Sequence, residues 1–338
     1  SEANKDYLGI AGLPAYGEAV IKLLFGADEP RTSDGIAATA HTPGGTGALR
    51  VAADLIHRVR PGATVWVSTP TWPNHPQVFA AAGLTTASYP YLDPSTGELD
   101  ADGMLGALAG AAPGDVVLLH ACCHNPTGID PDAATWQRIA DVVAERRLLP
   151  LVDFAYQGFG DGLREDAVGL EALLRPGAEL LVASSFSKNF ALYDERVGAL
   201  SLVCATKEEA SALLSHAKAA VRANYSNPPA HGGEVVATIL ADAELTARWM
   251  GEVTEMRDRI NGNRRAFVAA LAGEGASDVS HLLTGRGMFS LLGLDDAQLA
   301  ALRDKQAIYL VSRGRINFAG LSAVKIPIVA KAVAALLR

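Results

Sequence analysis

Five residues near the ends of predicted strands could together bind a phosphate group. Gly45 and Thr46 lie at the N-terminus of a predicted helix, just before its first residue at 48, and a helix N-terminus offers backbone N–H groups and a favourable dipole to an anion. Ser185 and Ser187 could add hydroxyl groups, and Arg196 could add a planar guanidinium that bonds phosphate oxygens in pairs. A fold that gathers these residues would therefore build a phosphate site.

Two further residues, Asp153 and Lys188, also follow predicted strands. A buried carboxylate can pair with a protonated ring nitrogen, and a lysine amine can form an imine with an aldehyde. A phosphate site, a buried acid and a lysine, each after its own strand, are the groups that pyridoxal 5′-phosphate (PLP) requires. The sequence therefore indicates a PLP site in which Lys188 carries the cofactor.

Each of these features has a more ordinary interpretation when it is taken alone. A glycine-rich turn is usually only a turn, an aspartate at a strand end is usually a cap, and a single lysine is usually solvated. The joint pattern outweighs these interpretations because every feature follows a predicted strand or begins a predicted helix.

The segment 120–124 contains two histidines and two cysteines, which could suggest a metal site. These residues lie too close together in the chain for a tetrahedral site, and no second ligand pair follows at zinc spacing. We expect no metal ion here and interpret these side chains as packing or supporting groups.

An alternation of strands and helices must position the site. Continuous apolar runs predict strands that are buried on both faces of a parallel sheet. These runs lie at 64–68, 116–120, 149–153, 180–184 and 199–204. Helices are predicted at 48–59 and 136–146, so the class is α/β. Ligands of such sheets bind at the carboxyl ends of the strands, where the residues named above lie.

The pattern changes near residue 256. A long charged helix covers 252–272, and a closing helix covers 328–337. Between them, shorter strands are predicted at 288–292, 307–311 and 316–319. We predict a large PLP-binding domain at residues 1–255 and a smaller α+β domain at residues 256–338.

Composition excludes several kinds of partner. The 338-residue chain has a net charge of −8 with scattered basic residues, which argues against a nucleic-acid or membrane surface. No apolar run approaches the roughly 20 residues of a membrane span. Three cysteines, two of them adjacent, cannot form a disulfide framework and favour a reducing compartment. We expect a cytoplasmic protein.

Long segments of the chain resemble the aspartate/aromatic aminotransferase family of PLP fold type I. They occur in the family's order and cover essentially the whole chain: 42–50 (TPGGTGALR), 70–75 (PTWPNH), 123–128 (CHNPTG), 153–158 (DFAYQG), 185–190 (SFSKNF), 222–229 (RANYSNPP) and 314–320 (GRINFAG). The resemblance implies a large domain with a mostly parallel seven-stranded sheet flanked by helices, plus a smaller α+β domain.

The resemblance implies catalytic roles for Lys188, Asp153 and Tyr156. Lys188 would hold the cofactor as a Schiff base and then act as general base and acid. Asp153, supported by His75, would keep the pyridine nitrogen protonated. Tyr156 and Asn125 would hydrogen-bond the phenolic oxygen of the ring and lower the pKa of the Schiff base.

Other matching residues would bind cofactor or substrate. Trp72 would stack on the ring and border the substrate. Arg315, assisted by Asn125, would bind the substrate α-carboxylate. The phosphate would be bound by the residues already named for it: Gly45, Thr46, Ser185, Ser187 and Arg196.

Two matching residues imply a homodimer with shared active sites. Tyr7 resembles the tyrosine that reaches the phosphate in the neighbouring subunit. Arg222 resembles the arginine that enters the neighbouring site and pairs with the distal carboxylate of aspartate or glutamate. An ordinary helix-end arginine is the alternative for Arg222, and its place within 222–229 favours the functional role.

The resemblance implies reversible amino transfer from aspartate to 2-oxoglutarate, which gives oxaloacetate and glutamate by a ping-pong mechanism. The partners are thus small amino acids and 2-oxo acids. Residues 227–231 are closer to the aspartate type, whereas 24–28 and 329–331 are closer to the aromatic type. An aminotransferase of dual specificity, which also takes tyrosine and phenylalanine, is therefore an alternative.

Family members carry some tens of residues before the segment that matches Tyr7, and this chain begins just before it. We expect the N-terminal part of the small domain to be absent from this chain. A truncated form that binds PLP with little turnover is a second alternative. A decarboxylase, lyase or β-elimination enzyme on the same fold and a non-enzymatic sensor are further alternatives.

Overall fold

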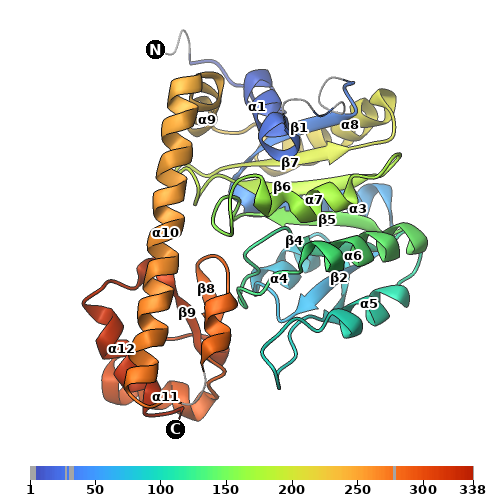
Figure 1. Cartoon of the computed structure of the whole chain (residues 1–338). Coiled ribbons are helices and arrows are strands. Elements are labelled where there is room, and N and C mark those ends of the chain that lie inside the picture. Colours follow the sequence, from blue (N-terminus) through green and yellow to red (C-terminus); the bar gives the residue numbers. More distant parts are fainter. Residues whose placement is uncertain (1–4, 27–28, 30–33, 277–278, 338) are drawn as a thin grey trace.

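The computed structural model describes residues 5–26, 29, 34–276 and 279–337, and its centre is a seven-stranded sheet (Figure 1). The strand order is β1-β7-β6-β5-β4-β2-β3. The strands are β1 (Ala37–Pro43), β2 (Thr64–Thr69), β3 (Thr85–Pro90), β4 (Val116–His120), β5 (Leu149–Phe154), β6 (Leu180–Ser185) and β7 (Val197–Val203). Strand β7 is antiparallel to β1 and β6, and the other pairs are parallel. The predicted fold class is confirmed.

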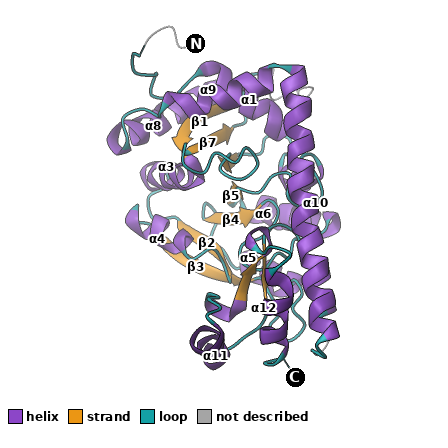
Figure 2. Ribbon diagram, turned by 90° about the vertical axis from the view of Figure 1, so that its left-hand side faces the viewer, coloured by secondary structure: helices purple, strands orange, loops and turns teal. Residues whose placement is uncertain are grey.

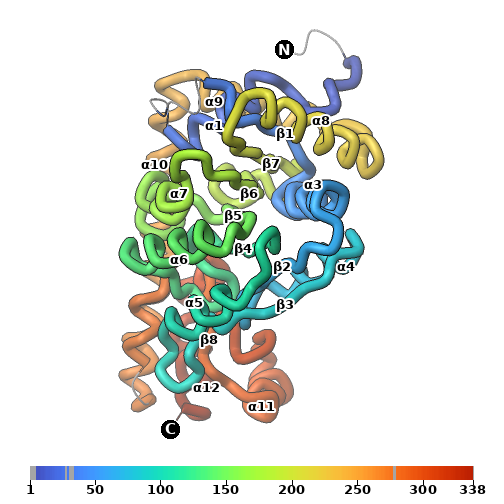
Figure 3. The backbone as a smooth tube through the Cα atoms, turned by 90° about the vertical axis from the view of Figure 1, so that its right-hand side faces the viewer, coloured from blue at the N-terminus to red at the C-terminus, as the bar shows by residue number. Residues whose placement is uncertain are grey.

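Helices cover both faces of this sheet and bury two separate apolar layers. Figure 3 shows α3, α4 and α8 on one side and α6 and α7 on the other. The strands β4 to β7 between them are buried along their whole length, as continuous apolar runs require. The helices of this part are α1 (Pro14–Phe25), α3 (Gly44–Val59), α4 (Asn74–Ala81), α5 (Ala101–Ala109), α6 (Ala133–Arg146), α7 (Val168–Leu173), α8 (Lys207–Asn224) and α9 (Ala230–Ala241), with the short 3-10 helix η1 (Glu165–Ala167).

The five strands predicted for the large domain are confirmed, with ends that differ by at most two residues. Strands β1 and β3 were not predicted. Both lie at edges of the sheet, and their sequences AATAHTP and TTASYP contain few large apolar residues. An edge strand pairs on one side only and is less buried, so it lacks the continuous apolar run of a central strand.

A single long helix, α10 (Ala243–Gly273), runs past the sheet and into the C-terminal part (Figures 1 and 2). It begins nine residues before the predicted start at 252, because the side chain of Asp242 accepts a hydrogen bond from Leu245 N and caps the helix. The predicted domain boundary between residues 255 and 256 falls inside this helix, and the division into two domains stays a prediction.

The C-terminal part contains a small antiparallel sheet of β8 (Phe289–Leu291) and β9 (Arg315–Asn317). The helices around it are α11 (Asp296–Gln306), α12 (Lys325–Ala334), η2 (Ser280–Thr284), η3 (Ser312–Gly314) and η4 (Phe318–Gly320). The predicted strands at 288–292 and 316–319 and the predicted closing helix at 328–337 exist with shifted ends. No helix in the described ranges is long and apolar enough to cross a membrane.

The predicted strand at 307–311 is wrong. Ala307 adopts a left-handed conformation (φ 53°) that ends α11, and Tyr309 and Val311 are exposed. Within the described part of the chain, the segment makes only one isolated bridge, between Val311 and Arg315. A β-strand needs backbone hydrogen bonds to a neighbouring strand, and this apolar segment has no neighbouring strand in the described part of the chain. Its apolar composition alone therefore predicted a strand that does not form.

Gly169 in α7 allows a close contact with the buried indole of Trp136, which a Cβ at position 169 would overlap. We expect Gly169→Ala to lower the free energy of unfolding by about 1–3 kcal/mol, measured by chemical denaturation. Gly262→Ala is the matched control, because Gly262 lies in α10 and no described atom stands within 4 Å of where its Cβ would be. That substitution should raise the free energy of unfolding by about 0.5–1 kcal/mol. Equal changes in both variants would contradict the packing argument.

Candidate active site

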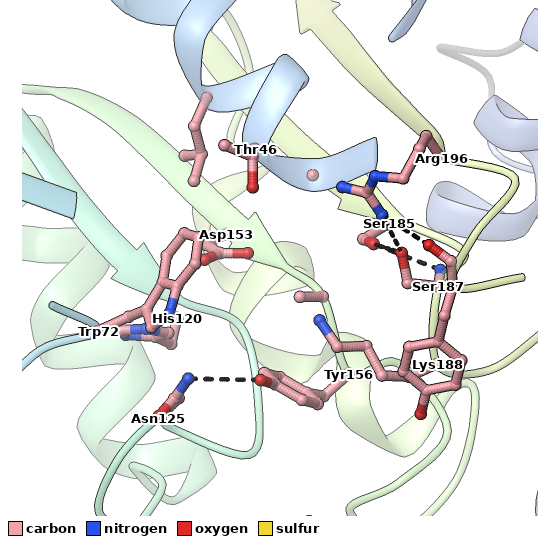
Figure 4. A pocket seen from close by; sticks show the side chains of 14 residues that line it. Thr46, Trp72, His120, Asn125, Asp153, Tyr156, Ser185, Ser187, Lys188 and Arg196 are labelled. Atoms are coloured by element: carbon pink, nitrogen blue, oxygen red, sulfur yellow. Dashed lines mark hydrogen bonds between the residues drawn. The ribbon is translucent and has the colours of Figure 1, made fainter. Parts of the chain in front are cut away.

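A cavity of about 250 Å³ lies at the carboxyl ends of the central strands (Figure 4). Strands β4, β5 and β6 end there at His120, Phe154 and Ser185, and helix α3 begins there. Ten of the site residues predicted from the sequence line the cavity: Gly45, Thr46, Trp72, Asn125, Asp153, Tyr156, Ser185, Ser187, Lys188 and Arg196.

One side of the cavity is built for an anion. Helix α3 starts after Pro43 without a side-chain cap, so its first N–H groups remain available to a ligand. The Arg196 Nη1 atom donates to Ser187 Oγ at 3.1 Å, and Ser185 Oγ lies 3.2 Å from the same oxygen. A Cβ at Gly44 would overlap the Arg196 guanidinium, so glycine is needed where the arginine crosses the helix start. These groups together suit a phosphate.

A buried carboxylate lies on the other side of the cavity. His75 Nε2 donates to Asp153 Oδ2 at 3.0 Å, and His75 Nδ1 lies 2.8 Å from Thr71 Oγ1. Burial alone would raise the pKa of Asp153, but the hydrogen bond from His75 holds that pKa below its usual value. Asp153 is therefore an ionised acid facing the cavity.

The amine of Lys188 points into the cavity between Asp153 and Tyr156 (Figure 4). Its Nζ atom lies 4.7 Å from the centre of the Tyr156 ring. Burial lowers the pKa of Lys188 from the value of a solvated lysine, which favours the neutral, reactive amine. Burial raises the pKa of Tyr156, so its phenol stays protonated.

Asn125 connects the lysine side of the cavity with Arg315. Its Nδ2 atom donates to the Tyr156 hydroxyl at 3.4 Å, and its Oδ1 atom accepts from Arg315 Nη1 at 3.1 Å. The Arg315 guanidinium carbon also lies 4.7 Å from the centre of the Phe289 ring. The structure thus places a guanidinium from the C-terminal part against Asn125, a residue that lines the cavity, although Arg315 itself is not among the lining residues. Its predicted role in binding the substrate carboxylate stays a prediction.

Tyr7 and Arg222 do not line this cavity. Tyr7 is 92% exposed, and Arg222 is exposed at the end of α8, where its guanidinium donates to Ser226 Oγ. The roles predicted for both residues belong to a neighbouring subunit and remain predictions.

His120 lines the cavity, although the sequence assigned it no more than packing or support. It ends β4 directly beside Asp153 of β5, so its position at a strand end was the available signal. Within the described residues neither ring nitrogen has a hydrogen-bond partner, and burial lowers its pKa to about 3, which keeps the ring neutral. Three further lining residues carried no sequence prediction: Leu49, Ala155 and Tyr193.

The side chains of His75, His120 and Asp153 place ligand atoms within 4.8 Å of one another. Both nitrogens of His75 are already engaged, one with Asp153 and one with Thr71. Hydrogen bonds therefore account for the approach of His75 to Asp153, whereas His120 packs beside them.

A mostly parallel sheet whose strand ends gather an anion site, an ionised acid and a lysine defines a PLP-dependent enzyme of fold type I. The sequence profile described as "Aminotransferase class I and II" matches residues 1–333. The chain therefore belongs to the class I and II aminotransferase family.

Individual relatives lie close to this chain. It is 50% identical over 338 residues to the aspartate aminotransferase of Escherichia coli strain K12, covering 100% of this chain and 85% of that one. It is 48% identical over 334 residues to the aromatic-amino-acid aminotransferase of Pseudomonas aeruginosa, covering 98% and 84%. The crystal structure of a Burkholderia pseudomallei aromatic-amino-acid aminotransferase, covalently bound to pyridoxal phosphate, superposes with a TM-score of 0.97 at 47% identity, covering 99% and 84%.

Proposed function

We propose that this chain transfers the amino group of aspartate to 2-oxoglutarate, with PLP held in the cavity. The observation that carries the proposal is the position of Asn125, which contacts both Tyr156, beside the Lys188 amine, and Arg315. Asn125 thus links the tyrosine beside the Lys188 amine to a guanidinium that can bind a carboxylate, and this arrangement suits an α-amino acid. The 50% identity to the E. coli aspartate aminotransferase supports aspartate as that amino acid.

The residues present fit PLP. The start of α3 with Ser185, Ser187 and Arg196 would hold its phosphate, and Asp153 would hold a proton at its ring nitrogen. When bound, PLP withdraws electrons from the substrate carbon that bears the amine. Trp72, which lines the same cavity, would cover the face of the ring.

Lys188 would move the proton that transamination requires. In its neutral form, the amine would take a proton from the substrate Cα and, once protonated, would return that proton within the same site. The protonated phenol of Tyr156 would be a hydrogen-bond donor to the phenolic oxygen of the cofactor. Arg315 orients the substrate through its α-carboxylate, so the Cα proton lies within reach of the amine.

A second candidate is an aminotransferase that also takes aromatic amino acids. The 48% identity to the Pseudomonas aromatic enzyme is nearly as high as that to the aspartate enzyme. The ratio of kcat/KM for aspartate to that for phenylalanine separates the two, and a ratio below one would favour the aromatic type.

Titration of the PLP-loaded protein with aspartate or cysteine sulfinate tests the proposed function. We expect the visible absorption of the bound cofactor to shift as its amino form accumulates, and oxaloacetate to appear in a coupled assay with 2-oxoglutarate. A stable band that neither amino acid shifts would refute turnover and favour a protein that only binds PLP. Elimination products in place of oxaloacetate would refute amino transfer.

We further propose that the active unit is a homodimer in which Tyr7 and Arg222 reach the neighbouring site. Their exposure in the single chain supports this, since a large aromatic residue that is 92% exposed is available for contact with a second copy. Three buried free cysteines support a cytoplasmic location.

Arg222→Ala should reduce kcat/KM for aspartate by about 10²-fold or more, because a distal carboxylate would lose its charged partner. Turnover of alanine, which has no distal carboxylate, should change little. Arg138→Ala on the exposed face of α6 is the control, and sedimentation of both variants monitors the dimer. Unchanged aspartate kinetics in Arg222→Ala would eliminate the shared-site proposal.

A further inference from the structure

Arg264 in α10 is a buried arginine that no carboxylate pairs with in the part of the chain that the structure describes. It is 2% exposed. Its Nη1 atom donates to Leu282 O at 3.3 Å and to Ser290 Oγ at 2.5 Å, and its Nη2 atom donates to Gly287 O at 2.6 Å. Burying a cation without a counter-charge costs folding free energy, and neutral oxygen acceptors offset that cost only in part. Such an arginine is therefore expected where it must hold the groups that accept its hydrogen bonds in place.

These partners belong to the segment 282–290, which packs on the loop that carries Asn125. Arg286 N donates to Gly128 O at 2.7 Å. The backbone at Gly287 lies so close to the Cys123 side chain that a Cβ would overlap it, and Gly128 lies equally close to the carbonyl of Phe289. Arg264 therefore holds the segment that supports the Asn125 loop.

The same guanidinium also contacts the strand pair that presents Arg315. Its carbon lies 4.4 Å from the centre of the Phe318 ring, and Phe318 directly follows β9. Its partner Ser290 lies in β8, next to Phe289, whose ring packs on the Arg315 guanidinium at 4.7 Å. The Phe289 ring also meets the Tyr156 ring edge-on at 6.2 Å. One buried cation thus contacts β8 directly and, beside β9, the residue that follows that strand.

We propose that Arg264 is a positioning residue for substrate binding, which sets the place of Arg315 through Phe289 and the Asn125 loop. The inference rests on the proposed role of Arg315 as the site of the substrate carboxylate. Lys188 follows β6 and Asp153 lies near the end of β5 in the large sheet, and in the described part of the chain the hydrogen bonds of Arg264 reach neither residue. Loss of Arg264 should therefore weaken the binding of carboxylates more than it slows the chemistry.

The test uses the PLP-loaded enzyme with Arg264→Met, which keeps an unbranched apolar side chain but is shorter and lacks the charge and the donors. We expect the Kd of succinate, measured by calorimetry, and the KM of aspartate to rise about tenfold, while kcat changes less than about threefold. Arg265→Met is the matched control, because Arg265 is the exposed neighbour on the same helix, and its Kd and KM should not change.

Ser290→Ala is a milder second variant, which removes one acceptor of Arg264 and should raise the Kd of succinate in the same direction. A folded Arg264→Met protein with unchanged Kd and KM would overturn the inference. If Arg264→Met does not fold, an unchanged Kd in Ser290→Ala overturns it instead. Arg315→Lys distinguishes a failure of the proposed function from a failure of the Arg264 inference. If this variant leaves the Kd of succinate unchanged, the proposed role of Arg315 in carboxylate binding is wrong.

Discussion

Lys188→Ala should lower kcat for aspartate by about 10⁴-fold or more, because no other described amine lines the cavity to carry the cofactor and move the Cα proton. The phosphate-binding residues are untouched by this change, so the variant should still bind PLP without a covalent bond. Borohydride reduction should attach the cofactor covalently to the unaltered protein and not to the variant. Mass spectrometry of the two proteins should detect this difference in mass.

The control for this prediction is Lys207→Ala, which removes an exposed lysine at the start of α8 and should keep full activity. If Lys188→Ala retained kcat within a factor of about ten, another group would have to supply the base, and the assignment of Lys188 would be wrong.

Asp153→Asn should lower kcat by about 10²–10³-fold, because an amide leaves the shape nearly unchanged but removes the negative charge that holds a proton at the ring nitrogen. Burial would raise the pKa of Asp153, but the hydrogen bond from His75 holds that pKa below its usual value. The carboxylate is therefore ionised at neutral pH and is protonated only as the pH falls below the usual carboxyl range.

Steady-state kinetics with aspartate measure this effect, with Asp153→Glu and Asp141→Asn as comparisons. Asp153→Glu keeps the charge and should retain more activity than Asp153→Asn, and Asp141→Asn on exposed α6 should have no effect. Equal activity of Asp153→Asn and Asp153→Glu would show that hydrogen bonding, and not charge, is the contribution of this residue.

The central strands and the residues that follow them could be predicted because their signals are local. A strand such as β5 is buried on both faces, so its sequence is continuously apolar until it reaches Asp153. Parallel strands end at one edge of the sheet, so residues at the ends of β5 and β6 lie near one another. Their proximity can therefore be predicted without knowing any side-chain contact. This is why Asp153 and Lys188 were placed together correctly.

Edge strands and unpaired apolar segments could not be predicted in the same way. Strand β3 is only partly buried and has a mixed sequence, whereas the apolar segment at 307–311 lacks a neighbouring strand. Whether a segment becomes a strand depends on a partner elsewhere in the chain, and composition does not contain that information.

The amino-acid order alone was enough to predict the α/β class, Lys188 as the cofactor lysine and the resemblance to the aminotransferase family, because apolar runs and motifs are contiguous in the sequence. The pairing of His120 with Asp153 depended on the register between β4 and β5. The contacts of Arg264 with Ser290 and Phe318, and of Phe289 with Arg315, depended on how α10 packs against the small sheet. Such contacts join residues far apart in the chain, and only the packing of whole elements brings them within reach of one another.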